Sequence, residues 1–134
     1  GYELLFRGGR RGAVATVEPK EDSSVPVLLW NIQEADEAAL DRYEGYPRFY
    51  DKQMMEVELK GKSVSAMVYV MTPGHAFGIP SYYYANTILE GYKTAGFDPK
   101  ILKQAIDRAF DLVWQDEQEG GQSRQGMGGW ETIQ

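Results

Sequence analysis

The sequence contains no cysteine and a single histidine, His75, and both shortages limit the chemistry that it can support. Without thiols there are no disulfides, thiolate metal ligands or cysteine nucleophiles. A catalytic triad would need His75 to meet both a serine and a carboxylate from its place in a turn-rich stretch. A metal site would rest almost wholly on carboxylates, and no calcium-loop or zinc spacing is present. We therefore expect neither a triad nor a metal site.

Positive charge and long apolar runs are also scarce. The 134 residues carry 20 acidic and 14 basic side chains, which gives a net charge of -6. The average field therefore repels phosphate backbones and anionic lipid surfaces, and no apolar run is long enough to span a bilayer. We expect no nucleic-acid partner and no membrane partner. The lack of cysteine and of a recognisable secretory signal favours a cytoplasmic location.

The composition that remains, 43% hydrophobic and 25% charged, is typical of a folded domain with one core. Strand-like patterns occupy the first half of the chain. The two longest are joined by Lys60-Gly61-Lys62, which predicts a hairpin. The predicted strands are residues 2–6, 13–17, 25–32, 49–59 and 64–71.

Helical patterns dominate the second half, but a short amphipathic helix is predicted earlier, over residues 36–43, and Gly45 and Pro47 stop it. Ser81 is a suitable N-cap for a longer helix that ends at Gly96, and Pro99 opens a last helix. Strands followed by helices predict an α+β fold with a mainly antiparallel sheet. We expect one domain over residues 1–115 and a flexible, glycine-rich tail over residues 116–134.

A basic loop, residues 7–12, follows the first predicted strand. Its glycines do not lead into a helix and it has no Gly-Lys-Ser/Thr ending, so we interpret it as a turn and not as a phosphate-binding loop. Its arginines, Arg7 among them, could bind a substrate carboxylate through bidentate guanidinium contacts. The alternative is that they are only solvated, as exposed loop arginines usually are.

Glu44 is the most conspicuous ionisable group, because it lies where the first predicted helix is broken and aromatic residues surround it in the sequence. Partial burial among such residues would disfavour the charged carboxylate and raise its pKa toward neutrality. The same group could then accept a proton and return it later in a reaction. The alternative is that Glu44 only caps the helix or forms a salt bridge at this bend.

From Leu4 to about Ala109 the chain resembles the γ-glutamylcyclotransferase-like family, also called AIG2-like. The central motif is Leu40-Asp41-Arg42-Tyr43-Glu44-Gly45-Tyr46-Pro47 with Tyr50 after it. The flanking segments that agree in order are Ala13-Val14-Ala15-Thr16, Val25-Pro26-Val27-Leu28-Leu29-Trp30, Ala66-Met67-Val68-Tyr69-Val70, and Pro80-Ser81 leading to Tyr84 and Gly91.

The resemblance implies a small mixed, mainly antiparallel β-barrel with flanking C-terminal helices. It also implies an enzyme of transferase or lyase type, without cofactor, that cyclises a γ-glutamyl group to 5-oxoproline and releases the attached amine. Glu44 falls on the catalytic glutamate of the family. Tyr50 falls on a tyrosine that faces the pocket, where it bonds substrate or Glu44, or simply packs. Tyr84 matches a tyrosine that closes the pocket, although its neighbours Tyr82 and Tyr83 compete for that assignment.

The sequence departs from the family pattern in one respect. The family has a Tyr-Gly-Ser-Asn segment near its start, and this segment does not occur in these 134 residues. In the family this strand and loop hold the glutamyl group and the developing oxyanion with backbone N–H groups, and Gly1 aligns beyond it. We therefore expect either a longer natural protein or an inactive relative that serves as a binding or interaction module. In the second case an unpaired sheet edge would accept a partner strand, in a homodimer or a strand-swapped oligomer.

Overall fold

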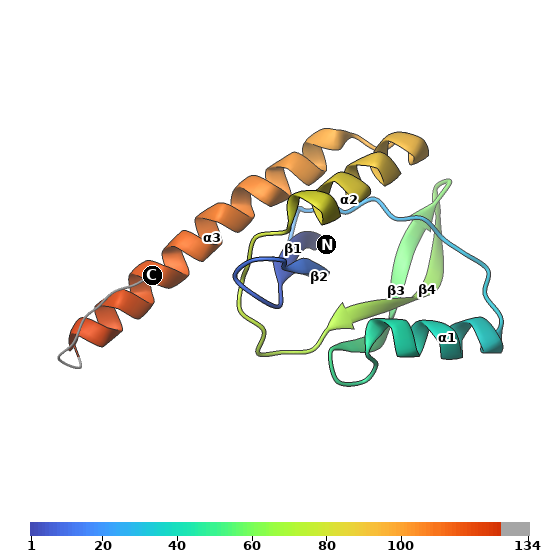
Figure 1. The fold of residues 1–134 in the computed structure, drawn as a ribbon. Helices are drawn as coiled ribbons and strands as arrows, with labels where there is room; N and C mark the ends of the chain where they lie inside the picture. Colours follow the sequence, from blue (N-terminus) through green and yellow to red (C-terminus); the bar gives the residue numbers. More distant parts are fainter. Residues whose placement is uncertain (127–134) are drawn as a thin grey trace. The chain divides into compact units, whose positions relative to one another are not determined.

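The computed structural model describes the backbone of residues 1–126 and the side chains of residues 1–119. Within that part of the chain, strands precede most of the helices, which confirms the α+β class (Figure 1). The elements in order are β1 (Tyr2–Arg7), β2 (Val14–Pro19), α1 (Glu34–Glu44), β3 (Tyr50–Leu59), β4 (Lys62–Met71), α2 (Tyr82–Ala95) and α3 (Pro99–Gly126).

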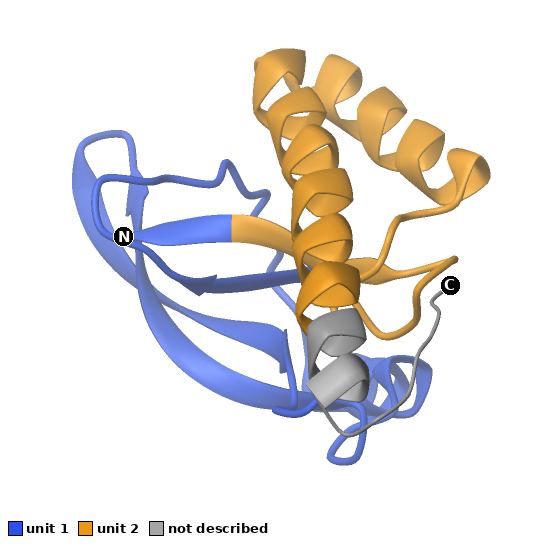
Figure 2. Cartoon of the chain, turned by 90° about the vertical axis from the view of Figure 1, so that its left-hand side faces the viewer, with its two compact units in different colours: residues 1–3, 16–75 blue, residues 4–15, 76–134 orange. Residues whose placement is uncertain are grey.

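The chain divides into two compact units, which are described separately (Figure 2). Unit 1 consists of residues 1–3 and 16–75, and unit 2 consists of residues 4–15 and the described residues from 76 onward. The strands β1 and β2 form one two-stranded sheet, and β3 and β4 form another. The strands of the described residues therefore do not form a closed barrel. The predicted single domain over residues 1–115 stays a prediction.

Unit 1 is built on the predicted hairpin, which the structure confirms. Its antiparallel register runs from Tyr50 opposite Met71 to Leu59 opposite Lys62. Lys60 and Gly61 both have positive φ, 53° and 79°, as a two-residue turn of type I′ requires. The side chain of Thr16, which is 4% exposed, accepts a hydrogen bond from the Met71 N–H at 2.9 Å. That contact ties β2 to the end of β4.

The predicted helix before the hairpin is also confirmed, with slightly wider bounds. It begins two residues earlier than expected because Gln33 and Asp36 form a capping box that satisfies its first N–H groups. It ends at Gly45, whose φ of 71° is the left-handed conformation that glycine adopts most easily. The result is that Glu44 is the last residue of α1.

The predicted strand over residues 25–32 is wrong. These residues belong to no helix, and no strand ladder of the described residues includes them. Val25 is half-buried, but the side chains of residues 27–30 and of Ile32 are between 40% and 79% exposed. An apolar run indicates a tendency toward burial, but a strand also needs a neighbouring backbone to pair with. Pro26 further removes one N–H donor from the segment.

Unit 2 has its core between residues 4–15, which contain the end of β1 and the start of β2, and the helices α2 and α3. Phe6 and Leu102 are each 1% exposed, and Ala13, Tyr92 and Ala109 complete the buried cluster. The predicted caps of α2 are confirmed, since Ser81 accepts a hydrogen bond from Tyr84 N–H at 3.1 Å and Gly96 closes the helix. The next helix, α3, packs against α2 (Figure 1).

The helix α3 continues to Gly126, whereas the sequence suggested a tail from residue 116. Its first two turns bury Leu102, and further along it buries Ala109 and Val113 at helical spacing. The remainder of the expected tail, residues 127–134, lies outside the described residues.

Candidate active site

Glu44 lies on the inner face of α1. The residues of this helix that are partly buried, Glu37, Leu40, Asp41 and Glu44, are three or four positions apart and therefore share one face. None of the α1 side chains is fully buried. The face that α1 turns inward thus carries three carboxylates and only one leucine.

Of these three carboxyl groups, that of Glu44 is the one whose charge no neighbouring group of the described residues balances. Burial raises its pKa above the usual value of 4.5, because a less polar environment disfavours the charged form. Among the described residues, no hydrogen bond or ion pair reaches its carboxylate. A half-buried carboxyl group in this state can accept a proton from a bound amine and give it to another atom.

The other two carboxylates are bound by residues of the hairpin. Lys52 Nζ lies 2.6 Å from Glu37 Oε2 and 3.1 Å from Asp41 Oδ2, and Tyr69 donates its hydroxyl to Asp41 Oδ1 at 2.5 Å. The hydrogen bond from Tyr69 is the main cause that lowers the Asp41 pKa, and the Glu37 carboxylate raises the pKa of Lys52. Burial, followed by the bond to Asp41, raises the pKa of Tyr69 to about 12.

Sequence reasoning missed this cluster, although Asp41 stands one helical turn before Glu44. The signal that could have found it is the hairpin register. Lys52 and Tyr69 are direct cross-strand partners, so their side chains lie on the same face of the hairpin. We call Glu37, Asp41, Lys52 and Tyr69 the α1 clamp.

A tight turn separates Glu44 from β3. Phe49 N–H bonds to Gly45 O at 2.9 Å, and the peptide bond between Tyr46 and Pro47 is cis. Thr72 Oγ1 lies 2.8 Å from Arg48 O and 3.1 Å from Phe49 O, which ties the turn to the residue that follows β4.

His75 supports the same turn. A ring nitrogen of His75 lies 3.0 Å from Thr72 Oγ1, and its ring meets the Phe49 ring edge-on, with 4.8 Å between the centroids. A hydroxyl that donates to a backbone carbonyl can accept a bond from an N–H of the imidazole. His75 therefore contacts the residues that hold the turn after Glu44, a role that the sequence did not indicate.

Tyr50 is the first residue of β3 and is 8% exposed. Its ring packs edge-on against Phe49 with 5.1 Å between centroids. Tyr50 therefore makes the packing contact that was the alternative to a role in substrate binding. Its contact with a substrate or with Glu44 stays a prediction.

Arg7 and Tyr84 belong to unit 2, whereas Glu44 and Tyr50 belong to unit 1. The Arg7 guanidinium stacks over the Phe77 ring, 3.8 Å from its centroid. The Tyr84 hydroxyl accepts a hydrogen bond from Ala15 N–H at 3.0 Å. Both side chains thus have a structural role within unit 2, and their contact with a substrate stays a prediction.

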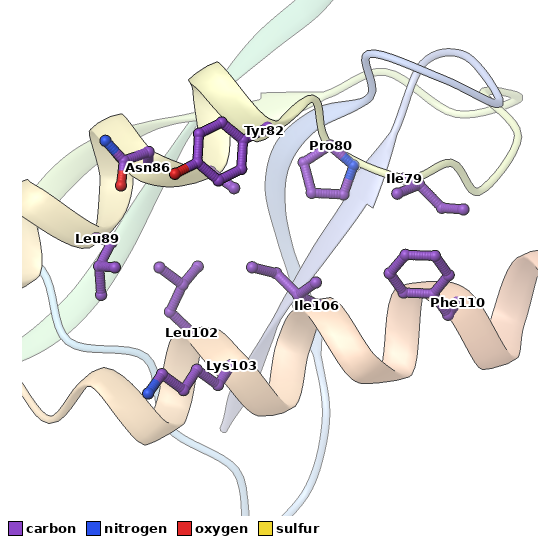
Figure 3. Close-up of a pocket in the computed structure, with 10 residues that line it drawn as sticks. Ile79, Pro80, Tyr82, Asn86, Leu89, Leu102, Lys103, Ile106 and Phe110 are labelled. Atoms are coloured by element: carbon purple, nitrogen blue, oxygen red, sulfur yellow. The ribbon is translucent and has the colours of Figure 1, made fainter.

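Unit 2 also contains a pocket of about 370 Å³ between α2 and α3, across which the side chains of the two helices face each other (Figure 3). Its lining is mostly apolar and includes no carboxylate, so it has no carboxyl group that could transfer a proton as expected of Glu44. The lining residues are Ile79, Pro80, Tyr82, Ala85, Asn86, Leu89, Leu102, Lys103, Ile106 and Phe110.

Among the side chains that the structure describes, no group of three or more His, Cys, Asp or Glu residues could hold a metal ion. None of the helices in this part of the chain is both long and apolar enough to cross a membrane.

Comparison with known proteins identifies a family. Residues 1–86 match the family model described as gamma-glutamyl cyclotransferase, AIG2-like. Neither a search of curated proteins nor a search of solved structures finds a match. The matched range is more than half of the chain and contains Arg7, Glu44, Tyr50 and Tyr84. The chain therefore belongs to the gamma-glutamyl cyclotransferase, AIG2-like family.

Proposed function

We propose that this protein cyclises a γ-glutamyl amine or peptide to 5-oxoproline and releases the attached amine, with Glu44 as general base and general acid. The observation that carries this proposal is the position of Glu44. It is a half-buried carboxyl group with a raised pKa, it is bound by no other described residue, and it lies inside the family match. Its neighbours on the same helix face, Glu37 and Asp41, are both bound by Lys52.

The reaction needs one group that moves a proton twice. The Glu44 carboxylate takes a proton from the substrate's α-amine, and the amine nitrogen attacks the γ-carbonyl carbon of the same molecule. A ring C–N bond forms while the bond from the γ-carbon to the departing amine breaks. The protonated Glu44 then gives its proton to the departing nitrogen, which restores the carboxylate. No cofactor takes part in these steps.

The remaining site residues are proposed for substrate binding. Tyr50, next to the turn after Glu44, would bond the substrate or Glu44 through its hydroxyl, and Tyr84 would close the pocket. Arg7 would bind a substrate carboxylate, for which a guanidinium is well suited. The γ-glutamyl substrates have such a carboxylate at their α-carbon. We further propose that the reaction takes place in the cytoplasm.

The closed barrel that the family resemblance implies would need a strand beside residues 25–32. That segment is rich in β-prone residues, and most of its apolar side chains are exposed. A strand and loop with the family's Tyr-Gly-Ser-Asn pattern would cover it and would supply backbone N–H groups for the oxyanion. A second copy of the chain could supply a strand instead, and sedimentation at several concentrations would reveal the resulting dimer.

The test is product formation. The 134-residue chain, and a version that carries a family-type Tyr-Gly-Ser-Asn strand and loop in front of it, are incubated with a panel of γ-glutamyl amines and peptides. Mass spectrometry then follows 5-oxoproline, with the Glu44→Gln variant of each form as the control. We expect product from the extended form and none above background from its control. No product from either form over the whole panel would contradict the proposed function.

A further inference from the structure

The helix that carries Glu44 is held in an unusual way, because it buries none of its side chains fully. Most helices in proteins are fixed by an apolar face, and the inner face of α1 offers only Leu40 for this purpose. Three polar contacts join α1 to the hairpin, two made by Lys52 of β3 and one by Tyr69 of β4. These polar contacts are therefore the candidates for what fixes the position of Glu44.

The α1 clamp meets the helix on both sides of Glu44 in the sequence. Before Glu44, the Asp41 carboxylate accepts hydrogen bonds from Lys52 and Tyr69. The backbone carbonyl of Asp41 accepts a hydrogen bond from Tyr46 N–H at 2.9 Å. After Glu44, the Lys52 ammonium lies over the Tyr46 ring, 4.3 Å from its centroid. One lysine thus contacts the residue three positions before Glu44 and the residue two positions after it.

The clamp is partly shielded from water. The Lys52 and Asp41 side chains are 20% and 26% exposed, so their attraction is less weakened by solvent than that of a surface ion pair. The cross-strand register sets Lys52 and Tyr69 side by side on the hairpin. A short hydrogen bond from Tyr69 fixes one Asp41 oxygen, and Lys52 fixes the other.

We propose that Lys52 and Tyr69 are positioning residues for the proposed reaction, and that they set the place of the Glu44 carboxylate by holding Asp41 and Tyr46. This inference rests on the proposed function, because positioning has a catalytic effect only if Glu44 transfers the proton. The clamp also occupies the two neighbouring carboxylates of the inner face. It leaves Glu44 as the only one of the three that can exchange a proton with a substrate.

The test compares four variants in a form of the protein that shows turnover. Lys52→Met removes the ammonium, Tyr69→Phe removes only the hydroxyl, and Lys52→Arg restores a positive charge. Ser63→Ala is the matched control. It removes the hydrogen bond from Ser63 to Glu56 at 2.7 Å, which lies on the same hairpin but does not involve α1. Each variant is measured for kcat and KM, for the Glu44 carboxyl titration by NMR, and for hydrogen exchange at the Tyr46 amide.

Misplacement of a reacting group lowers turnover more than substrate affinity. We expect Lys52→Met to lower kcat about 10- to 100-fold with KM within about twofold of the unchanged protein. Tyr69→Phe should show a smaller loss, Lys52→Arg should recover most of the kcat, and Ser63→Ala should match the parent. In Lys52→Met the Tyr46 amide should exchange faster and the Glu44 titration should move. A kcat that stays the same, per folded molecule, would overturn the positioning role.

Failure of the clamp and failure of the proposed function give different results. If no form of the protein shows turnover, the function is wrong, but the Tyr46 exchange rate and the Glu44 titration can still be measured in the 134-residue chain. Changes in both on Lys52→Met, absent in Ser63→Ala, would support the clamp as the device that places Glu44. No change in either would overturn it whether or not the protein is an enzyme.

Discussion

The substitution Gly78→Ala should be among the most damaging single-methyl additions in unit 2. A Cβ built at Gly78 would overlap the carbonyl oxygen of Gly9 and would lie 2.7 Å from its carbonyl carbon and 2.8 Å from the Ala13 Cβ. The first two of these atoms are backbone atoms, so no side-chain rotation relieves the overlap. The segment around Gly78 must therefore move away from the loop that contains Gly9.

The structure allows the cost of that movement to be worked out. Four backbone hydrogen bonds join the two segments: Gly8 N to Ala76 O, Gly78 N to Phe6 O, Ile79 N to Arg10 O and Ala13 N to Ile79 O, at 2.9–3.1 Å. Each is worth about 0.5–1.5 kcal/mol net, so their loss together costs about 2–6 kcal/mol. That is a large part of the roughly 5–15 kcal/mol by which a typical domain is stable.

The assay is urea unfolding followed by circular dichroism. The matched control is Gly91→Ala, the same change on the exposed side of α2, where an added Cβ meets no atom within 4 Å. Alanine is the better helix former by about 1 kcal/mol, so the control should be slightly more stable than the parent. If Gly78→Ala unfolds at the same urea concentration as the parent chain, the close approach of the two segments is refuted.

Two further predictions concern unit 1 and the candidate site. Thr16→Val should cost about 1–3 kcal/mol in the free energy of unfolding by urea, because it leaves the Met71 N–H without its acceptor in a buried place; an unchanged unfolding midpoint would contradict that account. The proposed base must be ionised, and burial raises its pKa, so kcat/KM should rise with pH through a midpoint above the usual 4.5 of a glutamate. A pH profile whose acidic midpoint lies at or below 4.5 would argue against Glu44 as the base.

Local signals in the sequence predicted much of the fold. Alternating side chains and the Lys60-Gly61 turn define the hairpin, and Ser81, Gly45 and Gly96 mark helix ends through their capping chemistry. Each of these features depends on residues within a few positions of one another. They could be predicted because the physical cause and its effect lie in the same short segment.

Features that depend on distant partners were not predictable in the same way. Residues 25–32 have the composition of a strand, but the composition does not say whether a neighbouring backbone is available. The α1 clamp joins Asp41 to Tyr69, 28 positions away, through the register of a hairpin. Glu44 was predicted from the aromatic residues near it and from the family resemblance. Only the structure shows that its two carboxylate neighbours are bound by other side chains while Glu44 itself is not.

The substitution Glu44→Gln tests the central claim most directly, because it keeps the shape of the side chain and removes the proton acceptor. In an active form of the protein, we expect the rate of 5-oxoproline formation to fall about 10²- to 10⁴-fold. Glu58→Gln, the same change at an exposed position on β3, serves as the control and should leave the rate unchanged.

Stability should not fall with activity in the Glu44→Gln variant. A raised pKa means that the ionised Glu44 is disfavoured in the folded state, so its effect on stability is most favourable at low pH and is lost as the pH rises through that pKa. At neutral pH an uncharged glutamine removes this cost, and the urea midpoint should stay equal or rise slightly. A rate that falls while the midpoint holds is the predicted result. A Glu44→Gln variant that still forms 5-oxoproline at the parent rate would contradict the account.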